Sequence, residues 1–455
     1  MRVVSALAQR AAPVPGEGVL PVVSRDDGVK RSKSTVYRER ALLVGVQIGK
    51  TADPWVDSME ELDQLAKTAG AQVIERVTQR RIHPDGGLYI GKGKASEIGG
   101  LVKELDIDVV IFDNDLSPAQ LRDLEKAVGA KVIDRTEVIL HIFAIHARSN
   151  QAKLQVELAQ LEYTLPRLRQ MWTHLEQGTG GVGIGQRGPG EKQIESDRRL
   201  ARKRISKLKE ELSRIEERKR REVFARSQNF TATLVGYTNA GKSTLMRRLT
   251  GADVLVEDRL FSTLDTKTHT WSLSNGHRVL LSDTVGFIRN LPHNLVASFH
   301  ATLEEATQAD LLMHIVDASH PEAVNQAMAV QSVLRELGCG DHDALLVFNK
   351  VDAIRDPVDH QILCTRFPGA VEISARTGEG IDALEARVTE VLEQRAEEME
   401  IDVPLGHGKA LAYIADRARV LAQEQVDSVM RMRVRCGRRD AAMLRKMLEE
   451  TPASL

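Results

Sequence analysis

An eight-residue segment from Gly236 to Ser243 has the spacing G-x-x-x-x-G-K-S, which is typical of a loop that binds phosphate groups. Its glycines let successive backbone N–H groups turn toward an anion. Lys242 can reach the β- and γ-phosphates of a nucleotide, and the Ser243 hydroxyl can ligate Mg²⁺. The expected phosphate-binding residues are Gly236, Tyr237, Thr238, Asn239, Ala240, Gly241, Lys242 and Ser243.

The residues around this loop favour the same interpretation. Phe230–Val235 is an apolar run that predicts a buried strand, and Thr244–Leu249 has the pattern of a helix start. A strand, a glycine-containing loop and a helix are the context that a phosphate-binding loop requires.

A second group of residues indicates which base is bound. Asn349, Lys350, Val351 and Asp352 follow an apolar run and so lie at the carboxyl end of a predicted strand. The Asp352 carboxylate can accept hydrogen bonds from N1–H and the exocyclic amine of guanine, and adenine offers no such pair of donors. The segment that fits a loop for guanine O6 follows another apolar run and comprises Ser374, Ala375 and Arg376. This order and spacing predict a guanine-nucleotide site.

Two further segments lie between these motifs. Asp283, Thr284, Val285 and Gly286 follow a predicted strand. Asp283 can hold Mg²⁺ through water, and the Gly286 N–H can bind the γ-phosphate. We therefore assign catalytic roles to Gly286, Asp283 and Lys242 in a GTPase.

The earlier segment contains a threonine that can ligate Mg²⁺. It comprises Phe261, Ser262, Thr263, Leu264 and Asp265. We choose Thr263 as the ligand and count this whole segment in the GTP site. Thr266 and Thr268 are rivals that spacing alone does not exclude.

Two departures from the commonest small-GTPase pattern bear on hydrolysis. Phe287 follows Gly286 at the position where many GTPases carry a glutamine that orients water. A phenylalanine cannot hydrogen-bond water, so a partner or an ion should complete the site. Asn239 lies in the phosphate loop, where GTPases similar to the potassium-activated class use an asparagine to help hold K⁺, which can supply positive charge. The alternative is that Asn239 only tolerates a tight backbone turn.

Composition bounds the class of protein. A chain of 455 residues suggests about three domains. Its net charge of −1 does not mark the chain as a whole as nucleic-acid binding. Cys339, Cys364 and Cys436 are scattered without C-x-x-C spacing, which argues against a disulfide framework or a zinc site. Because no apolar run is long enough to span a membrane, we expect a monomeric cytoplasmic protein with at most peripheral membrane association.

The chain divides into five predicted parts. Residues 1–38 are expected to be a disordered tail. We favour this over an organellar transit peptide because Pro13, Pro15, Gly16 and Gly18 argue against a sustained amphipathic helix. Residues 39–148 alternate strand and helix and predict a small, mainly parallel α/β domain. Its expected strands are Ala41–Ile48, one from Val73, Val109–Phe112 and Lys131–Asp134, and its expected helices start at Ser58, as N-cap, and at Ser117-Pro118.

Residues 149–227 predict a helical hairpin arm. One helix is expected from Asn150 to Leu175 with a kink at Pro166, and a second from Glu191 to Arg226. A glycine-rich tip separates them. It contains G-x-G-x-x-G twice, but we reject a dinucleotide site because helices flank it. The second helix carries 14 Lys/Arg against 7 Asp/Glu between residues 192 and 226.

This basic arm fits insertion into RNA, although a solvated helical hairpin is the simpler alternative. The candidate RNA-contact residues are Arg187 and Gln186 in the tip, Trp172 for base stacking, and Lys92 and Lys94 in a Gly-Lys-Gly-Lys segment of the first domain. By composition alone, that last segment is more simply a basic surface turn.

Residues 228–396 are the expected doubly wound GTPase domain, and residues 397–455 a small α+β domain. In the latter we expect a helix from Lys409 to about Gln425, a strand over Ser428–Val434 and an Arg-bearing stretch from Arg435 to Lys446. That stretch could contact RNA or be ordinary surface.

In combination, these motifs resemble the HflX family of GTPases. The resemblance covers about Ala41 to Arg395 and depends on Gly86–Lys94, Gln155–Leu161, Gly185–Glu191 with Asp197–Arg199, and the GTPase motifs. It implies binding to the large ribosomal subunit and its rRNA, GTP hydrolysis stimulated there, dissociation of stalled ribosomes, and an arm that reaches toward the peptidyl-transferase region. A second hypothesis is a GTP-gated RNA- or ribosome-binding module, such as an assembly or tethering factor, in which hydrolysis only times release. A weaker third is an RNA-remodelling NTPase.

Overall fold

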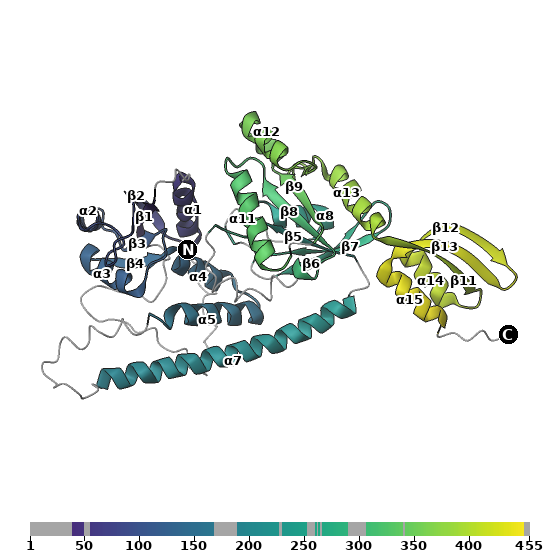
Figure 1. The fold of residues 1–455 in the computed structure, drawn as a ribbon, viewed down its shortest axis with the longest axis horizontal. Coiled ribbons are helices and arrows are strands. Elements are labelled where there is room, and N and C mark those ends of the chain that lie inside the picture. The colour runs from purple at the N-terminus through teal and green to yellow at the C-terminus, as the bar shows by residue number, and fades with distance from the viewer. Residues whose placement is uncertain are drawn as a thin grey trace, which may run out of the picture.

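The computed structural model describes residues 39–49, 55–167, 189–226, 230–252, 260–261, 263, 266–289, 306–339 and 342–449 (Figure 1). The predicted tail, residues 1–38, and most of the glycine-rich tip of the arm lie outside these ranges. The described residues contain three sheets of four, six and three strands. In Figure 1 the sheets follow one another along the molecule in chain order, and the long helix α7 (Pro189–Arg226) runs beneath the first two.

The first sheet is fully parallel, with the order β2 (Gln72–Arg81), β1 (Arg40–Ile48), β3 (Val109–Phe112) and β4 (Lys131–Asp134). Alternate β1 side chains enter two different cores. This is the two-sided burial expected of a parallel strand covered by helices on both faces. The predicted parallel α/β fold of this region is therefore confirmed.

Four helices cover this sheet. They are α1 (Trp55–Thr68), α2 (Lys92–Glu104), α3 (Pro118–Val128) and α4 (Arg135–His146). Ser117 caps α3 through a complete capping box with Gln120, as the Ser-Pro pair predicted. The predicted N-cap of α1 is wrong, because the helix already begins at Trp55. Ser58 lies inside α1, and its hydroxyl donates to Asp113, a contact that sequence spacing does not reveal.

The arm contains α5 (Asn150–Thr164) and α7. Leu158 from α5 packs with Leu208 and Leu212 from α7 in a small buried core. Ion pairs from Arg204 to Glu157 and from Lys209 to Glu162 border that core. The prediction of one helix to Leu175 is wrong, because α5 ends at Thr164. Leu165 keeps helical backbone angles (φ −55°, ψ −45°). The regular helix ends at this point because Pro166 has no N–H to donate to the carbonyl of Glu162, and residues 168–175 of the predicted helix lie outside the described residues.

The second sheet has six strands in the order β10-β9-β8-β5-β7-β6, and only β6 is antiparallel to its neighbour among the described strands. The strands are β5 (Phe230–Gly236), β6 (Lys267–Ser272), β7 (Arg278–Asp283), β8 (Leu311–Asp317), β9 (Ala344–Asn349) and β10 (Val371–Glu372). The helical elements are α8 (Lys242–Thr250), α11 (Ala323–Glu336), η1 (Val351–Ala353), α12 (Pro357–Arg366) and α13 (Ile381–Gln394). The loops after β5, β7, β8, β9 and β10 therefore meet at one edge, where open α/β sheets bind ligands.

The third sheet is antiparallel, with the order β11 (Ala396–Pro404), β13 (Val429–Gly437) and β12 (Arg419–Val426). Helices α14 (Gly408–Arg417) and α15 (Arg438–Glu449) complete this α+β unit. The predicted helix to Gln425 is wrong, because α14 ends at Arg417 and β12 follows. Val426 pairs with Val429, and Asp427 has a φ of +55° between them. This tight hairpin turn outweighs the helix propensity of the preceding residues.

One core continues from the first sheet into the second. Phe143 of α4 and Leu62 of α1 share it with Phe261, Val285 and Phe287 of the GTPase motifs. The N-terminal domain is thus packed against those motifs. None of the described helices has the length and apolar character needed to cross a membrane.

Candidate functional site: a nucleotide site at the edge of the central sheet

The phosphate loop joins the end of β5 to the start of α8. Gly241 caps α8 with a φ of +93°, and a Cβ at this position would lie 2.2 Å from Asn349 Nδ2. Both the left-handed backbone and the close approach of Asn349 require glycine here. Asn239 also has a positive φ of +59°. The N-terminus of α8 therefore follows a tight loop, an arrangement that favours anions.

The Lys242 side chain lies across this loop. Its Nζ atom donates to the carbonyl oxygens of Gly236, at 3.0 Å, and Tyr237, at 2.8 Å. Burial lowers the pKa of Lys242 to about 8, and the nearby Asp283 carboxylate acts in the opposite direction. A buried ammonium that is held mainly by neutral carbonyls would gain from an anion, and phosphate oxygens supply one.

Three oxygen-bearing side chains from separate segments meet beside the loop. Ser243 Oγ donates to Asp283 Oδ2 at 2.6 Å, and Thr263 Oγ1 lies 2.9 Å from Ser243 Oγ and 3.2 Å from the same carboxylate oxygen. Asp283 is fully buried, and burial raises its pKa. Its Oδ1 atom has no hydrogen-bond partner in the described part of the chain. Hydroxyl and carboxylate oxygens suit a hard divalent cation such as Mg²⁺.

The rival threonines lie differently. Thr268 is on β6, and its Oγ1 lies 2.9 Å from Ser282 Oγ on the neighbouring strand. Thr266 immediately precedes that strand. The structure therefore brings Thr263, and not Thr268, to the oxygen cluster.

Gly286 lies directly against the phosphate loop. A Cβ on it would be 2.6 Å from Thr238 Cα and 3.1 Å from Lys242 Nζ, so only glycine fits. The preceding Thr284 donates its hydroxyl to the Leu234 carbonyl at 2.7 Å, and Val285 is buried in the shared core. These contacts hold the Asp283–Gly286 segment beside β5.

Phe287 is held by its backbone and buried by its ring. Its carbonyl accepts from Thr238 N at 2.6 Å, and its N–H donates to the Gly236 carbonyl at 3.1 Å. The ring is 4 % exposed and packs in the shared core. It can therefore neither orient water nor leave its place without disturbing that core.

The base-reading segments meet beside the phosphate loop. Asn349 bridges them, because its Nδ2 donates to the Ala240 carbonyl and its Oδ1 accepts from Ala375 N, both at 2.9 Å. Asp352 accepts from Ser374 Oγ at 2.7 Å and pairs with Arg376 at 2.7 Å. The Ser374 hydrogen bond, with the Arg376 charge adding to it, holds the pKa of Asp352 below its usual range. Asp352 is thus an ionised acceptor at the rim of the site.

Some predicted residues cannot be placed. Ser262, Leu264, Asp265, Trp172, Gln186 and Arg187 lie outside the described residues. Lys92 and Lys94 are described, but they form the first turn of α2 and not a turn in a loop. Lys94 pairs with Glu97 at 2.8 Å, within the same helix.

The structure also adds residues that motif reading missed. Asp317, at the end of β8, accepts from Lys350 Nζ at 2.7 Å and so positions the Lys350 stem. The sequence contains a signal for this residue, because an acid directly after the apolar run of residues 311–316 lies at the carboxyl end of a predictable strand.

A second missed group joins the phosphate loop to the N-terminal domain. The Tyr237 hydroxyl donates to Glu61 of α1 and accepts from Arg289 N at 2.8 Å. Arg135, at the start of α4, pairs with Glu61 and Asp113 and donates to the Arg289 carbonyl at 3.1 Å. No local pattern reveals these contacts, because each joins residues far apart in the chain.

The fold and site are those of a P-loop GTPase. The defining features are a phosphate loop at the end of β5, a buried acid at the end of β7, and two loops for the base at the ends of β9 and β10. Residues 231–350 match the family model described as 50S ribosome-binding GTPase. Two further models match the preceding regions, GTP-binding GTPase N-terminal over residues 56–144 and GTP-binding GTPase Middle Region over residues 146–226.

The chain belongs to the family of GTPase HflX. It is 49 % identical over 359 residues to GTPase HflX of Lacrimispora saccharolytica, covering 76 % of this chain and 81 % of that protein. It is 42 % identical over 376 residues to GTPase HflX of Escherichia coli, covering 82 % and 87 %. Among solved structures, a GTP-binding protein from Sulfolobus solfataricus in complex with GDP is 25 % identical over 78 % of this chain and 98 % of that chain, with a TM-score of 0.41.

Proposed function

We propose that this GTPase acts on the large ribosomal subunit and its rRNA, in the cytoplasm, and uses GTP to dissociate or rescue stalled ribosomes. Family membership supports a ribosomal target, because one matching family model is described as a 50S ribosome-binding GTPase. The observation that carries the proposal in this chain is a row of exposed cations on α7 that have no acidic partner among the described residues.

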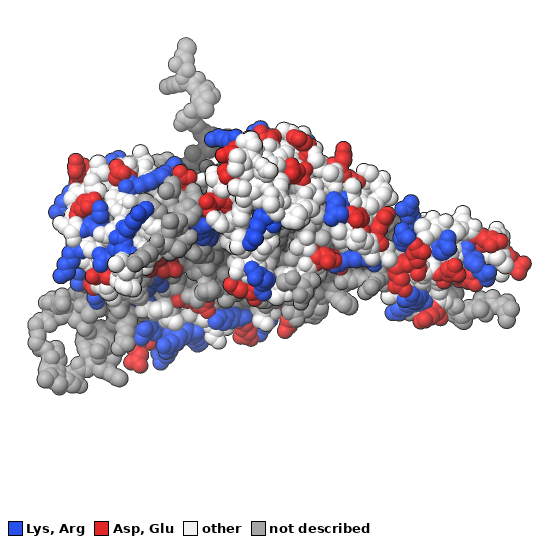
Figure 2. All heavy atoms as spheres, turned by 45° about the horizontal axis from the view of Figure 1, so that its top comes forward, with Lys and Arg blue, Asp and Glu red and all other residues white. Residues whose placement is uncertain are grey.

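These cations are Arg199, Arg202 and Lys203. All three are exposed, and none forms an ion pair with another described residue. Farther along α7, by contrast, Lys207, Lys209 and Arg214 are each paired with a glutamate. On the face shown in Figure 2, the lower edge carries basic side chains interspersed with acidic ones. Exposed cations in the first half of α7, without an acidic partner in the described part of the chain, suit contact with the RNA backbone.

The residues of the nucleotide site fit this cycle. Ser243 and Thr263, with Asp283 behind them, would hold Mg²⁺, which neutralises charge on the β- and γ-phosphates when bound. Lys242 would exchange its two carbonyl contacts for phosphate oxygens. The Gly286 N–H would bind the γ-phosphate, and Asp352 would accept from the guanine edge. Phe287 occupies the position of the glutamine of other GTPases and its ring is buried, so hydrolysis should depend on a partner.

Asn239 remains a proposed K⁺ ligand. Its positive φ also gives it a purely structural reason to be asparagine. Equal GTP hydrolysis in KCl and NaCl would remove the potassium proposal, and faster hydrolysis in KCl that disappears in Asn239→Ala would support it.

The central experiment measures GTP hydrolysis with and without purified large ribosomal subunits in potassium buffer. A triple variant Arg199→Ala, Arg202→Ala and Lys203→Ala should retain intrinsic hydrolysis. Its stimulation by subunits should be at least about tenfold weaker, because three phosphate contacts are removed. The matched control replaces Lys207, Lys209 and Arg214, which have glutamate partners, with alanine. Equal stimulation in both triple variants would contradict a role for this row.

Ribosome splitting with hydrolysis blocked separates the two mechanisms. Splitting by the protein bound to a non-hydrolysable GTP analogue supports dissociation driven by binding. Stable binding to one subunit without splitting would favour a GTP-gated binding module.

A further inference from the structure

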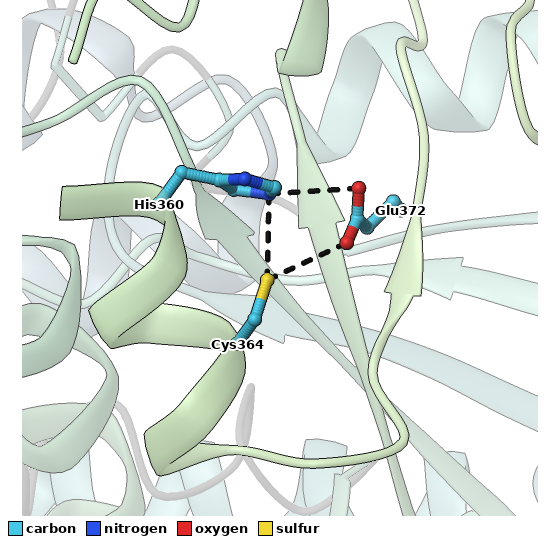
Figure 3. A group of neighbouring side chains, drawn as sticks. All are labelled: His360, Cys364 and Glu372. Carbon is cyan, nitrogen blue, oxygen red and sulfur yellow. Dashed lines mark hydrogen bonds and ion pairs between the residues drawn. The ribbon is translucent and has the colours of Figure 1, made fainter. Parts of the chain in front are cut away.

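Three side chains with metal-binding atoms meet at the edge of the central sheet, where α12 lies beside β10 (Figure 3). His360 and Cys364 are four residues apart on α12, so they share one helix face. Glu372 is the last residue of β10. None of the three belongs to the nucleotide site described above.

The three side chains contact one another, and Glu372 uses a different carboxylate oxygen for each of its contacts. His360 Nε2 is 3.4 Å from Cys364 Sγ, Cys364 Sγ is 3.4 Å from Glu372 Oε1, and His360 Nε2 is 3.5 Å from Glu372 Oε2. One ligand atom from each residue lies within 4.8 Å of the other two. Tetrahedral zinc has bonds of about 2.0–2.3 Å to N, O and S ligands, which places these ligands about 3.3–3.7 Å apart. The contact distances of 3.4–3.5 Å lie in this range, so a small shift of the Glu372 carboxylate would bring one of its oxygens, the imidazole nitrogen and the sulfur onto one face of a zinc tetrahedron.

The types of the ligand atoms select the metal. Thiolate and imidazole favour a borderline-soft ion, whereas Mg²⁺ and Ca²⁺ prefer oxygen ligands throughout. The site is also accessible, since the side chains of His360 and Glu372 are 25 % and 49 % exposed. Three protein ligands with an accessible fourth position are characteristic of zinc sites that retain water or bind a further group.

We propose that His360, Cys364 and Glu372 form a Zn²⁺ site with an open fourth coordination position. The site would tie α12 to β10. Glu372 lies two residues before Ser374, whose hydroxyl contacts Asp352. The metal would therefore brace the strand that leads into the base-reading loop.

A different explanation for the cluster is a set of hydrogen bonds among a histidine, a cysteine and a glutamate, without any metal. A probe that reports thiolate coordination separates this explanation from a metal site, because a hydrogen-bonded thiol gives no such signal.

The probe is Co²⁺, titrated into the full chain already loaded with Mg²⁺ and GDP, so that the nucleotide site is occupied. We expect one equivalent to bind with a thiolate-to-cobalt charge-transfer band and tetrahedral ligand-field bands, and Zn²⁺ to displace it. Cys364 is the natural source of this band, since the other two cysteines of the chain, Cys339 and Cys436, are buried. Cys364→Ser should abolish the band.

His360→Gln and Glu372→Gln should each weaken Co²⁺ and Zn²⁺ binding by at least about tenfold, because even outer-shell partners of a metal contribute that much. Asp359→Asn, an exposed acid on the same helix, is the matched control and should bind normally. Circular dichroism and GDP retention check that each variant is folded. The absence of a thiolate band in the unmodified chain, or its survival in folded Cys364→Ser, would overturn the proposal.

Discussion

The ring of Phe143, in α4 of the N-terminal domain, packs edge-on against the ring of Phe261, which precedes Thr263. The ring centroids are 4.7 Å apart and the planes meet at 74°. Phe261 is also bound to the phosphate loop, because its N–H donates to Thr238 Oγ1 at 3.0 Å. One aromatic pair thus links α4 to the segment that carries the candidate Mg²⁺ ligand.

Phe143→Ala should therefore affect nucleotide release as well as stability. Loss of a buried phenylalanine costs about 3 kcal/mol of unfolding free energy, and Phe261 would lose its support, so GTP should dissociate several-fold faster. A fluorescent GTP analogue measures this rate. Leu124→Ala, in the core on the opposite face of the same sheet, is the control, with a similar stability loss but an unchanged rate. Equal rates in all three proteins would show that the contact is structural only.

Lys242→Ala should weaken GTP binding by at least about 30-fold, because the phosphates lose a buried ionic partner. Calorimetric titration of GTP into the nucleotide-free protein measures the loss. The variant should fold normally, since the substitution also removes a buried charge held mainly by two carbonyl oxygens. Unchanged GTP binding would remove the assignment of the phosphate loop.

Asp352→Asn should change the base preference from guanine toward xanthine, because the amide presents a donor where guanine needs an acceptor. We expect the ratio of GTP to XTP affinity to fall by at least about 100-fold. Competition between the two nucleotides measures this ratio. Arg376→Ala, which removes one neighbour of the carboxylate, should leave the preference for guanine intact. A folded Asp352→Asn protein that still prefers GTP would contradict the base-reading role.

His314 on β8 should make the protein sensitive to mild acid. It is 2 % exposed, and its Nε2 has no hydrogen-bond partner among the described residues. Burial lowers its pKa to about 4 from 6.5, and the Lys242 charge acts in the same direction. Between about pH 4 and 6.5, the unfolded chain therefore binds a proton at His314 that the folded protein does not bind. The stabilisation of the folded state by neutral His314 is complete above about pH 6.5 and is lost as the pH falls toward 4.

Over that window the loss is about 3 kcal/mol. Urea unfolding at pH 7, 6 and 5 measures it. Between pH 7 and pH 5, the unfolding free energy of His314→Leu should fall less than that of the unmodified chain. His83→Leu, at an exposed histidine, is the control and should lose as much stability as the unmodified chain. Parallel stability curves for His314→Leu and the unmodified chain would exclude this origin of acid sensitivity.

Sequence patterns predicted the parallel N-terminal fold and the P-loop domain well, because parallel strands are short continuous apolar runs and their loops carry recognisable motifs. The strand limits Val109–Phe112 and Lys131–Asp134 agree with the structure. Sequence patterns gave the wrong secondary structure where contacts with a neighbouring element determine it. β12 was predicted as helix because its pairing with β13 is invisible in the local sequence, and α5 ended earlier than its apolar periodicity suggested.

The chain by itself determined the order of the GTPase motifs, the guanine-type base reader and the family. These depend on residue types at short, fixed spacings, which local backbone geometry turns into a loop or a cap. Tertiary structure alone decided that Thr263 joins Ser243 and Asp283, that Tyr237 meets Glu61 of the N-terminal domain, and that Glu372 completes a triangle with His360 and Cys364. Each of these contacts joins separate segments of the chain, and only the packing of sheets and helices brings such segments within bonding distance.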